Sequence, residues 1–375
     1  KEKMIDIKQD GSYRLNMEYF DYENGGTMIR EERFAELFGG GRRQPESAIT
    51  SREMNIAASV QKLVEEIIIL IAKHAKEVYG QGIKHLVLAG GVALNCVANG
   101  KLLREKIFER VWIQPAAGDA GGALGAALYA YYMEYHGKRS VDDCDSQQGS
   151  YLGPEFSVEE MKSYLQKNGY IYHEFADKAE FFEKAAHELA SEKVIGLFHG
   201  RMEYGPRALG NRSIIADSRS PKMQSKLNLK IKYRESFRPF APSVLEERLG
   251  DYFELSAPSP YMLLVDEVKK DNQRPFDLDK LLAASEEDML PVVNEVRSDI
   301  PAVTHVDYSA RIQTVNRERN EHYYDLIKAF ERETGCGVIV NTSFNVRGEP
   351  IVCTPQEAYE CFMRTEMDVL LLENL

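Results

Sequence analysis

The densest group of side chains suited to chemistry lies in a basic segment that runs from residue 201 to residue 238. It holds ten Lys or Arg against three Asp or Glu, a local charge of +7 in a chain whose net charge is -12. The ten are Arg201, Arg207, Arg212, Arg219, Lys222, Lys226, Lys230, Lys232, Arg234 and Arg238. Charge runs are commonly solvated faces, but Gly205, Pro206 and Gly210 impose a defined loop on these arginines. Fixed guanidinium groups donate paired hydrogen bonds, so phosphate or an acyl phosphate is the expected ligand.

Neighbouring residues distinguish two arginines of this segment. Phe237 and Phe240 flank Arg238 and should hold it beside an apolar wall. Arg234 directly precedes Glu235, which can pair with it in solvent. We therefore expect Arg238 to be partly desolvated and Arg234 to lie on the surface.

A second set of hydrogen-bonding groups follows a short apolar strand predicted over 337–340. The loop 341–348 begins with Asn341 and Ser343, which offer amide, hydroxyl and backbone groups at the end of that strand. Ligands of open α/β sheets usually bind at such strand ends. Arg311 is an isolated candidate, and from its surroundings alone it would be interpreted as a surface arginine.

Two glycine-rich turns are candidates in the first third of the chain. Gly90 and Gly91 follow a predicted strand and precede Asn95, so the turn can admit a nucleotide, although tight packing is the commoner reason for such a turn. Asp119 lies in a loop ahead of a small-residue helix, where its carboxylate can bind a metal or cap the helix. Spacing alone favours capping.

Composition limits what else the chain can be. It has 375 residues, 43% apolar and 28% charged, which supports buried cores in two compact units. The negative net charge argues against a surface built to neutralise nucleic-acid backbones. The most apolar stretch, residues 67–72, is too short to span a bilayer, so no membrane anchor is expected. The chain opens with Lys1 and without a secretion signal, as a fragment of a longer protein would.

Cysteine and histidine spacing predicts neither disulfides nor a metal site. The five cysteines, Cys96, Cys144, Cys336, Cys353 and Cys361, are odd in number and include no pair with two-residue spacing. The eight histidines include no pair four residues apart, so no zinc or iron site follows from the histidine pattern. A reducing cytoplasm is the expected compartment.

The elements that position these residues form two α/β units, 1–136 and 151–375, joined by the polar linker 137–150. Residues 1–50 are expected to be irregular or weakly stranded. Further on in the first unit we predict helices over 50–80, 95–108 and 123–132 and strands over 84–89 and 110–114. In the second unit we predict helices over 157–167 and 179–192, a helix from Thr354, and strands over 170–175, 194–198 and 337–340. Capping boxes mark two of the helix starts, Thr50 with Glu53 and Thr354 with Glu357.

Four motifs, in order, give the chain a resemblance to a known family. Residues 88–100, 115–121, 200–213 and 341–345 resemble the O-carbamoyltransferases that modify antibiotics and nodulation factors. The likeness covers nearly the whole chain and corresponds to the later two-thirds of these proteins. It implies an α/β chain made of the second half of a domain with the actin and hexokinase fold, followed by a YrdC-like domain with a twisted open sheet.

The resemblance also implies a reaction. The YrdC-like domain of the family binds carbamoyl phosphate and ATP, with Mg²⁺, and makes carbamoyl adenylate. The actin-like domain then transfers the carbamoyl group to a hydroxyl of a small acceptor beside Fe(II) or another divalent metal. Two histidines of the N-terminal half and an aspartate that aligns with Asp119 hold that metal, so the metal site should be incomplete in this chain.

Site residues follow from the same resemblance, position by position. The carbamoyl phosphate pocket carries over onto Arg207, Lys232, Arg238, Arg311, Asn341 and Ser343. The nucleotide site of the transfer domain carries over onto Gly90, Gly91 and Asn95. The family thus favours Asp119 as a metal ligand, and a homodimer is compatible with it.

Other functions remain open. Relatives that make threonylcarbamoyl adenylate for tRNA or mature hydrogenases share both domain types. The motif at 202–213 favours the small-molecule branch, and the cysteine pattern of a zinc finger is missing. A third alternative is a double-stranded RNA-binding module, in which the basic segment lies across a phosphate backbone.

Overall fold

The computed structural model describes residues 1–23, 25–44, 47, 49–80, 82–141, 145–277 and 293–375. These residues form two compact units. The first combines Lys1–Val87 with Val97–Trp112, and the second combines Leu88–Cys96 with Ile113–Leu375. The linker predicted at 137–150 lies within the second unit and stays a prediction as a domain boundary.

The sequence predicts neither disulfides nor a membrane-spanning helix. The described cysteines Cys96, Cys336, Cys353 and Cys361 are free thiols, and Cys144 lies outside the described residues. Of the helices that the structure describes, not one is both long enough and apolar enough to cross a bilayer.

The first unit is organised around the long helix α2 (Ser51–Tyr79). The predicted capping box forms at its start, where the backbone N–H of Thr50 donates to the Glu53 carboxylate at 2.9 Å. Helix α3 (Cys96–Arg104) is tied to α2 by an ion pair of 3.1 Å between Lys101 and Glu65.

The described part of residues 1–50 contains the short strands that were expected and one helix that was not. Strands β1 (Ile5–Ile7) and β2 (Tyr13–Leu15) form an antiparallel hairpin. Helix α1 (Glu31–Phe38) follows and was not expected. It has eight residues, no side-chain cap at Arg30 and no buried residue, so the local signals that identified α2 are missing there.

The predicted succession of strand, glycine turn, helix and strand is confirmed. Strand β3 (His85–Leu88) leads into the 3-10 turn Gly91–Leu94, and strand β4 (Arg110–Ile113) pairs with β3. Helix α4 (Ala120–Tyr129) then starts so close to the preceding loop that a Cβ on Gly121 would collide with the carbonyl of Ala116.

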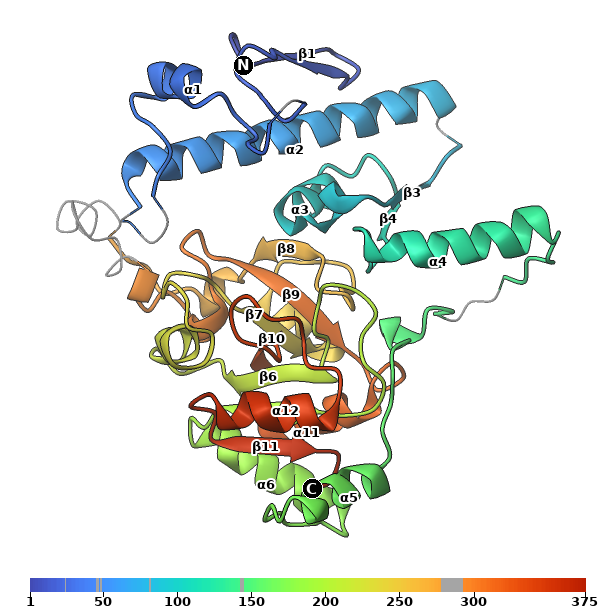
Figure 1. Cartoon of the computed structure of the whole chain (residues 1–375), viewed down its shortest axis with the longest axis vertical. Helices are drawn as coiled ribbons and strands as arrows, with labels where there is room; N and C mark the ends of the chain where they lie inside the picture. The colour runs from blue at the N-terminus through green and yellow to red at the C-terminus, as the bar shows by residue number, and fades with distance from the viewer. Residues whose placement is uncertain (24, 45–46, 48, 81, 142–144, 278–292) are drawn as a thin grey trace. The chain divides into compact units, whose positions relative to one another are not determined.

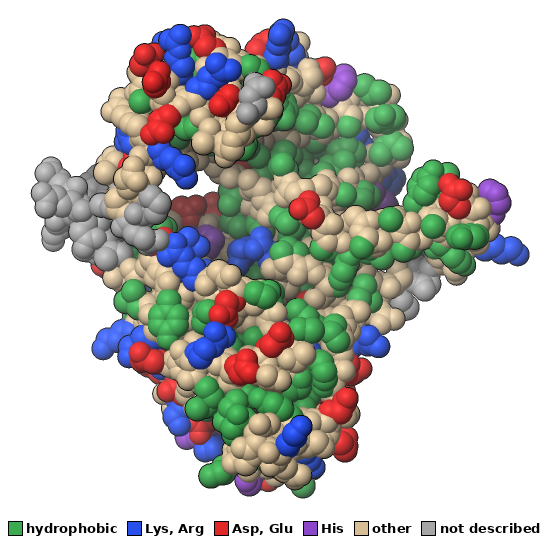
Figure 2. All heavy atoms as spheres, viewed as in Figure 1, with side chains coloured by type: hydrophobic (Ala, Val, Ile, Leu, Met, Phe, Trp, Pro, Cys, Tyr) green, Lys and Arg blue, Asp and Glu red, His purple; other side chains and the backbone are tan. Residues whose placement is uncertain are grey.

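A π-helical turn, Ala130–Glu134, ends this segment. Hydrophobic side chains gather along α4 and this turn (Figure 2), where Tyr129, Met133 and Tyr135 are exposed.

The second unit is built on a mixed seven-stranded sheet with the order β11-β5-β6-β10-β7-β9-β8 (Figure 1). Its strands are β5 (Ile195–Phe198), β6 (Arg212–Asp217), β7 (Ala241–Leu245), β8 (Leu264–Glu267), β9 (Ser309–Val315), β10 (Val338–Ser343) and β11 (Val369–Leu372). Two neighbouring pairs are parallel, β11 with β5 and β7 with β9, and the other pairs are antiparallel. Every residue of β5, β6 and β7 is buried, so the sheet forms the core of this unit.

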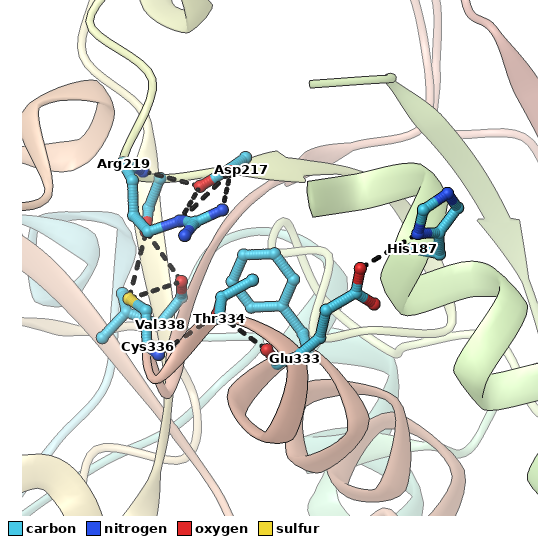
Figure 3. Close-up of polar contacts among 9 residues, drawn as sticks. His187, Asp217, Arg219, Glu333, Thr334, Cys336 and Val338 are labelled. Carbon is cyan, nitrogen blue, oxygen red and sulfur yellow. Dashed lines mark hydrogen bonds and ion pairs between the residues drawn. The ribbon is translucent and has the colours of Figure 1, made fainter. Parts of the chain in front are cut away.

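Helices cover the sheet. They are α5 (Val158–Lys167), α6 (Lys178–Ala190), α7 (Met223–Lys226), α8 (Leu249–Tyr252), α11 (Glu321–Thr334) and α12 (Pro355–Met363). Helices α6 and α11 pack against each other and against β6, β7 and β10, whereas α12 packs against β5, β11 and α5. Figure 3 shows His187 of α6 facing Glu333 of α11, with 3.0 Å between Nδ1 and the carboxylate. The α/β class with an open sheet is confirmed.

Two predictions about strands are wrong. Residues 170–175 form no strand, because Ile171 is fully exposed and Tyr170 instead stacks on Tyr359 of α12 with 3.9 Å between ring centroids. Conversely, β10 continues past residue 340 through Ser343. Asn341 therefore lies within the sheet, between Ile215 of β6 and Ala241 of β7, and does not lie in a loop.

A buried arginine holds the loop 200–213 against the sheet. Arg212 is fully buried, and its guanidinium donates to the carbonyls of His199 (2.8 Å), Gly200 (3.1 Å) and Pro154 (3.3 Å) while lying 3.6 Å from the Phe198 ring centroid. The Arg212 side chain therefore has a structural role in this loop.

Glu203 completes the same loop from the other side. One of its buried carboxylate oxygens, Oε1, accepts hydrogen bonds from the backbone N–H groups of Leu209 (2.6 Å) and Asn211 (2.9 Å). The loop conformation is therefore fixed by one arginine and one glutamate, each bonded to backbone groups.

We expect Arg212→Met to lower the free energy of unfolding by about 3 kcal/mol, because several buried carbonyls would lose a charged donor. Chemical denaturation monitored by circular dichroism measures this change. Arg201→Met is the matched control, since Arg201 is exposed and pairs with Glu155 at 3.7 Å, and it should cost about 1 kcal/mol or less. Equal losses in the two variants would contradict a structural role for Arg212.

Candidate functional site

Arg207, in the loop 200–213, uses only part of its hydrogen-bonding capacity. Its Nη2 donates to the carbonyl of Leu94 at 3.3 Å and lies 3.4 Å from Cys96 Sγ. Its Nε is buried and has no hydrogen-bond partner among the described residues. A buried guanidinium nitrogen without an acceptor is costly, and a bound anion would supply the acceptor.

Arg311 belongs to the same group of charges. It lies on β9 opposite Val265 of β8, and its Nε is likewise buried without a partner in the described part of the chain. Burial, together with the positive charges of Arg207 and Arg234, lowers the pKa of Arg311 to about 10. The interpretation of Arg311 as a surface arginine is therefore wrong.

The expected environments of Arg234 and Arg238 are reversed. Arg234 is half-buried, its guanidinium lies 4.9 Å from the Phe240 ring centroid, and burial lowers its pKa to about 10. Arg238 is exposed and pairs with Glu235 at 3.0 Å. Phe240 therefore packs on Arg234, whereas Glu235 pairs with Arg238.

Lys232 is the most buried amine of the basic segment. Its Nζ donates to Asn345 Oδ1 (2.8 Å), to the carbonyls of Asn345 and Ser343 and to Ser343 Oγ (3.3 Å). Burial, followed by the positive charge of Arg234, lowers the pKa of Lys232 to about 7. Lys232 and Ser343, both predicted site residues, are thus in direct contact.

These four cations, Arg207, Lys232, Arg234 and Arg311, are called the cation cluster from here on. The charges in this cluster repel one another. The positive charge of Arg207 lowers the pKa of Arg311, and that of Arg234 lowers the pKa of both Arg311 and Lys232. Glu235 is the one carboxylate among the groups that shift the pKa values of Lys232, Arg234 and Arg311. Side chains held together against their mutual repulsion indicate a site for an anion.

Asn341 is fixed beside the cluster by a buried polar network. Its Nδ2 donates to Gln313 Oε1 (2.7 Å) and to the Ala208 carbonyl (3.1 Å), one residue after Arg207. Gln313 in turn donates to the Leu209 carbonyl at 2.9 Å and accepts from Ser243 Oγ at 2.6 Å. The Oδ1 atom of Asn341 is buried and has no partner among the described residues.

The network adds positioning residues that the sequence did not reveal. Gln313 and Ser243 lie on neighbouring parallel strands and pair in register. Glutamine and serine in strands carry no local signal of function, so only the register brings them to Asn341.

The glycine turn keeps its predicted shape. Gly90 has a φ of +94°, a backbone conformation that favours glycine, and no atom lies within 4 Å of a Cβ placed on Gly90 or Gly91. The space expected for a ligand is therefore open, and tight packing does not explain these glycines. Asn95 ends the 3-10 turn that follows. Their role in nucleotide binding stays a prediction.

Asp119 does not cap α4, although spacing favoured capping. It occupies the N-cap position but makes no side-chain capping hydrogen bond, and its side chain is exposed. Among the described residues, it belongs to no group of three or more candidate metal ligands. Asp119 is therefore free to act in another way, and its role as a metal ligand stays a prediction.

The fold assembles a histidine cluster that the sequence spacing did not predict. His199 and His322 stack with ring centroids 3.7 Å apart, and His199 Nδ1 lies 2.6 Å from the Glu373 carboxylate. One candidate ligand atom from each of the three residues lies within 4.8 Å of the other two. The absence of a zinc or iron site, expected from the histidine spacing, stays a prediction, but the fold brings together candidate ligands that are distant in sequence and that spacing along the chain cannot detect.

Curated relatives extend over the whole chain. An uncharacterised protein of Synechocystis is 55% identical over 100% of this chain, which covers 60% of that protein. The nodulation protein NolO of Bradyrhizobium diazoefficiens is 36% identical over 99% of this chain, which covers 60% of NolO. Nodulation protein U of Rhizobium fredii is 36% identical over 71% of this chain and 39% of its own length. The chain thus spans 39% to 60% of the length of these relatives.

A solved structure is also similar at a distance. Full-length HypF in the phosphate- and nucleotide-bound form matches 52% of this chain and 25% of that chain, with 19% identity and a TM-score of 0.33.

Two family descriptions match the sequence itself. Carbamoyltransferase N-terminus matches residues 1–128, and Carbamoyltransferase C-terminus matches residues 186–375. The second match contains the whole cation cluster, Asn341 and Ser343. The chain belongs to the carbamoyltransferase family.

Proposed function

We propose that this chain carries out the activation step of an ATP-dependent O-carbamoyltransferase, in which carbamoyl phosphate and ATP give carbamoyl adenylate. The cation cluster is the observation that supports the proposal most directly. In the complete protein, the carbamoyl group would then pass to a hydroxyl of a small metabolite.

The cluster suits the phosphate end of carbamoyl phosphate. Arg207 and Arg311 each have a buried Nε without an acceptor, and their mutual repulsion is relieved when a dianion lies between them. Arg238 would join them from the rim, exchanging Glu235 for phosphate oxygens. Lys232 would add point charge and hold Ser343 in place.

The unpartnered oxygen of Asn341 suits the other end of the same molecule. A carbamoyl NH₂ group is a donor, and Asn341 Oδ1 is a buried acceptor held rigidly by Gln313 and Ala208. Recognition of both ends would distinguish carbamoyl phosphate from inorganic phosphate, which lacks the donor.

The reaction balances in two steps. Water first cleaves the bond between phosphorus and the carbamoyl oxygen, which gives carbamate and inorganic phosphate. A carbamate oxygen then attacks the α-phosphorus of ATP and expels pyrophosphate, which leaves carbamoyl adenylate. The cations would stabilise the charge that develops on the phosphoryl oxygens, and Mg²⁺ would accompany ATP.

The transfer step needs more than the described residues provide. We propose residues 1–136 as part of an actin-like transfer domain, with Gly90, Gly91 and Asn95 at its nucleotide site, and 151–375 as a YrdC-like domain. Asp119 supplies one exposed carboxylate, which by itself does not fit a stable site for Fe(II) or another divalent metal. The activation chemistry above involves no metal at Asp119.

The RNA-binding alternative is disfavoured by ion pairing. Four other cations of the basic segment already have acidic partners, namely Arg201 with Glu155, Arg219 with Asp217, Lys226 with Asp368 and Lys230 with Glu366. Charges paired in this way contribute little to a phosphate-backbone contact.

The proposal is tested by incubating the chain with ATP and labelled carbamoyl phosphate. We expect pyrophosphate and labelled carbamoyl adenylate to form only when both substrates are present. Threonine with bicarbonate in place of carbamoyl phosphate should give no pyrophosphate. Pyrophosphate release with threonine and bicarbonate, or none under any condition, would contradict the proposal.

Arg311→Met should weaken carbamoyl phosphate binding by about tenfold or more, because a desolvated charged hydrogen bond is worth about 1.5 to 3 kcal/mol. Isothermal titration calorimetry measures the affinity. Arg317→Met is the control, since Arg317 is exposed and paired with Glu321 at 2.9 Å. The cluster would not be the binding site if both variants bound as well as the unmodified chain.

Carbamoyl phosphate affinity should fall as the pH rises from 6.5 to 8.5. The pKa of Lys232 is lowered to about 7, so the folded protein loses this positive charge over that range. The affinity for the anion should therefore fall by up to about tenfold per pH unit. Titrations across this range should show a flat profile for Lys232→Met. Lys222→Met, at an exposed position, should keep the slope, and a slope unchanged in Lys232→Met would rule out Lys232 as its source.

A further inference from the structure

We propose that His199, His322 and Glu373 form a binding site for a divalent transition metal such as Zn²⁺ in the second unit. The site is separate from Asp119 and from the cation cluster, so it goes beyond the proposed function.

The topology of the sheet creates this site. Strands β5 and β11 are parallel neighbours with Phe198 paired to Leu372, so His199 and Glu373 emerge side by side at the carboxyl edge of the sheet. Helix α11 begins at Glu321, and His322 lies in its first turn. The carboxyl edge of parallel strands next to a helix start is the usual ligand position in α/β sheets.

The hydrogen bonds leave two imidazole nitrogens available. Glu373 Oε1 accepts from the Gly200 N–H at 2.7 Å, and Oε2 lies 2.6 Å from His199 Nδ1. In the tautomer in which His199 Nδ1 donates to Glu373, the Nε2 atom of His199 keeps a lone pair for a metal. The Nε2 atom of His322 is buried and has no hydrogen-bond partner among the described residues.

Two imidazoles and one carboxylate are a ligand set for Zn²⁺ or Fe(II) with open coordination positions. Bonds of about 2.1 Å place tetrahedral ligand atoms about 3.4 Å apart. One ligand atom of each residue lies within 4.8 Å of the other two, and the two imidazole rings are stacked, so the side chains must turn before both rings can reach one ion. Rotation of the two histidine side chains supplies this movement, and Glu373 either binds the ion or orients His199 toward it.

The open positions would face a cavity of about 930 Å³. Besides the cluster itself, the cavity is lined by five cationic side chains, Lys178, Arg201, Arg317, Arg319 and Arg332, and by the two acidic side chains Glu321 and Asp325, so cations are in excess. An anionic or oxygen-donor ligand of the metal is therefore the class of molecule that the cavity would accept.

The experiment uses the full chain after removal of metal with a chelator. Isothermal titration with Zn²⁺ and visible absorption with Co²⁺ should reveal one site per chain, and the Co²⁺ spectrum should show nitrogen ligation. His322→Ala and His199→Ala should each weaken Zn²⁺ binding by tenfold or more and abolish the Co²⁺ spectrum. Circular dichroism of each variant confirms that it is folded.

Two controls separate this site from other binding. His187→Ala removes an exposed imidazole that also pairs with a glutamate, and it should leave Zn²⁺ affinity unchanged. Asp119→Asn should likewise keep the site, whatever its effect on carbamoyl transfer. Zn²⁺ binding that survives in both His199→Ala and His322→Ala, that is lost in Asp119→Asn, or that is not detected at all would overturn the proposal.

Discussion

The guanidinium of Arg212 is the interaction on which both candidate sites depend. It is buried and donates to backbone carbonyls, among them those of His199 and Gly200, while the carboxylates of Glu203 and Glu373 stabilise its charge from nearby. The same bonds fix the start of the loop that carries Arg207 and the end of the strand that carries His199. A single buried cation therefore couples the position of the cation cluster to that of the histidine cluster.

In the cation cluster, unlike at Arg212, several positive charges lie close together. Arg207 and Arg234 both lie close enough to Arg311 to repel it, and the buried Nε atoms of Arg207 and Arg311 lack acceptors among the described residues. Such an arrangement costs folding free energy and persists because the rest of the sheet and the network through Gln313 hold it in place. Such a cost in folding free energy is typical of a preorganised anion site.

Local signals predicted much of the fold. The helices that begin after Thr50 and Thr354 were correctly placed, because a capping box is a short-range pattern that needs no tertiary contact. Strand β10 was found but ended too early, since polar residues such as Asn341 resemble a loop and their partners lie on other strands. Residues 170–175 had the aromatic pattern of a strand, yet Tyr170 uses its ring to pack on α12.

The site was less predictable for the same reason. Motifs identified Arg207, Asn341 and Ser343, but the burial of Arg311 and the exchange of roles between Arg234 and Arg238 depend on contacts across the sheet. The histidine cluster joins three elements that are distant in sequence, so no spacing rule can detect it.

The burial of Lys232 has a consequence for its reactivity. Burial lowers the pKa of Lys232 to about 7, so this amine gives up its proton more readily than an ordinary lysine. Acyl phosphates and isocyanates modify such amines readily. The oxygen atoms of Ser343 and Asn345 surround Nζ, however, and the side chain is 3% exposed. The packing that lowers the pKa of Lys232 thus also restricts access to its Nζ atom.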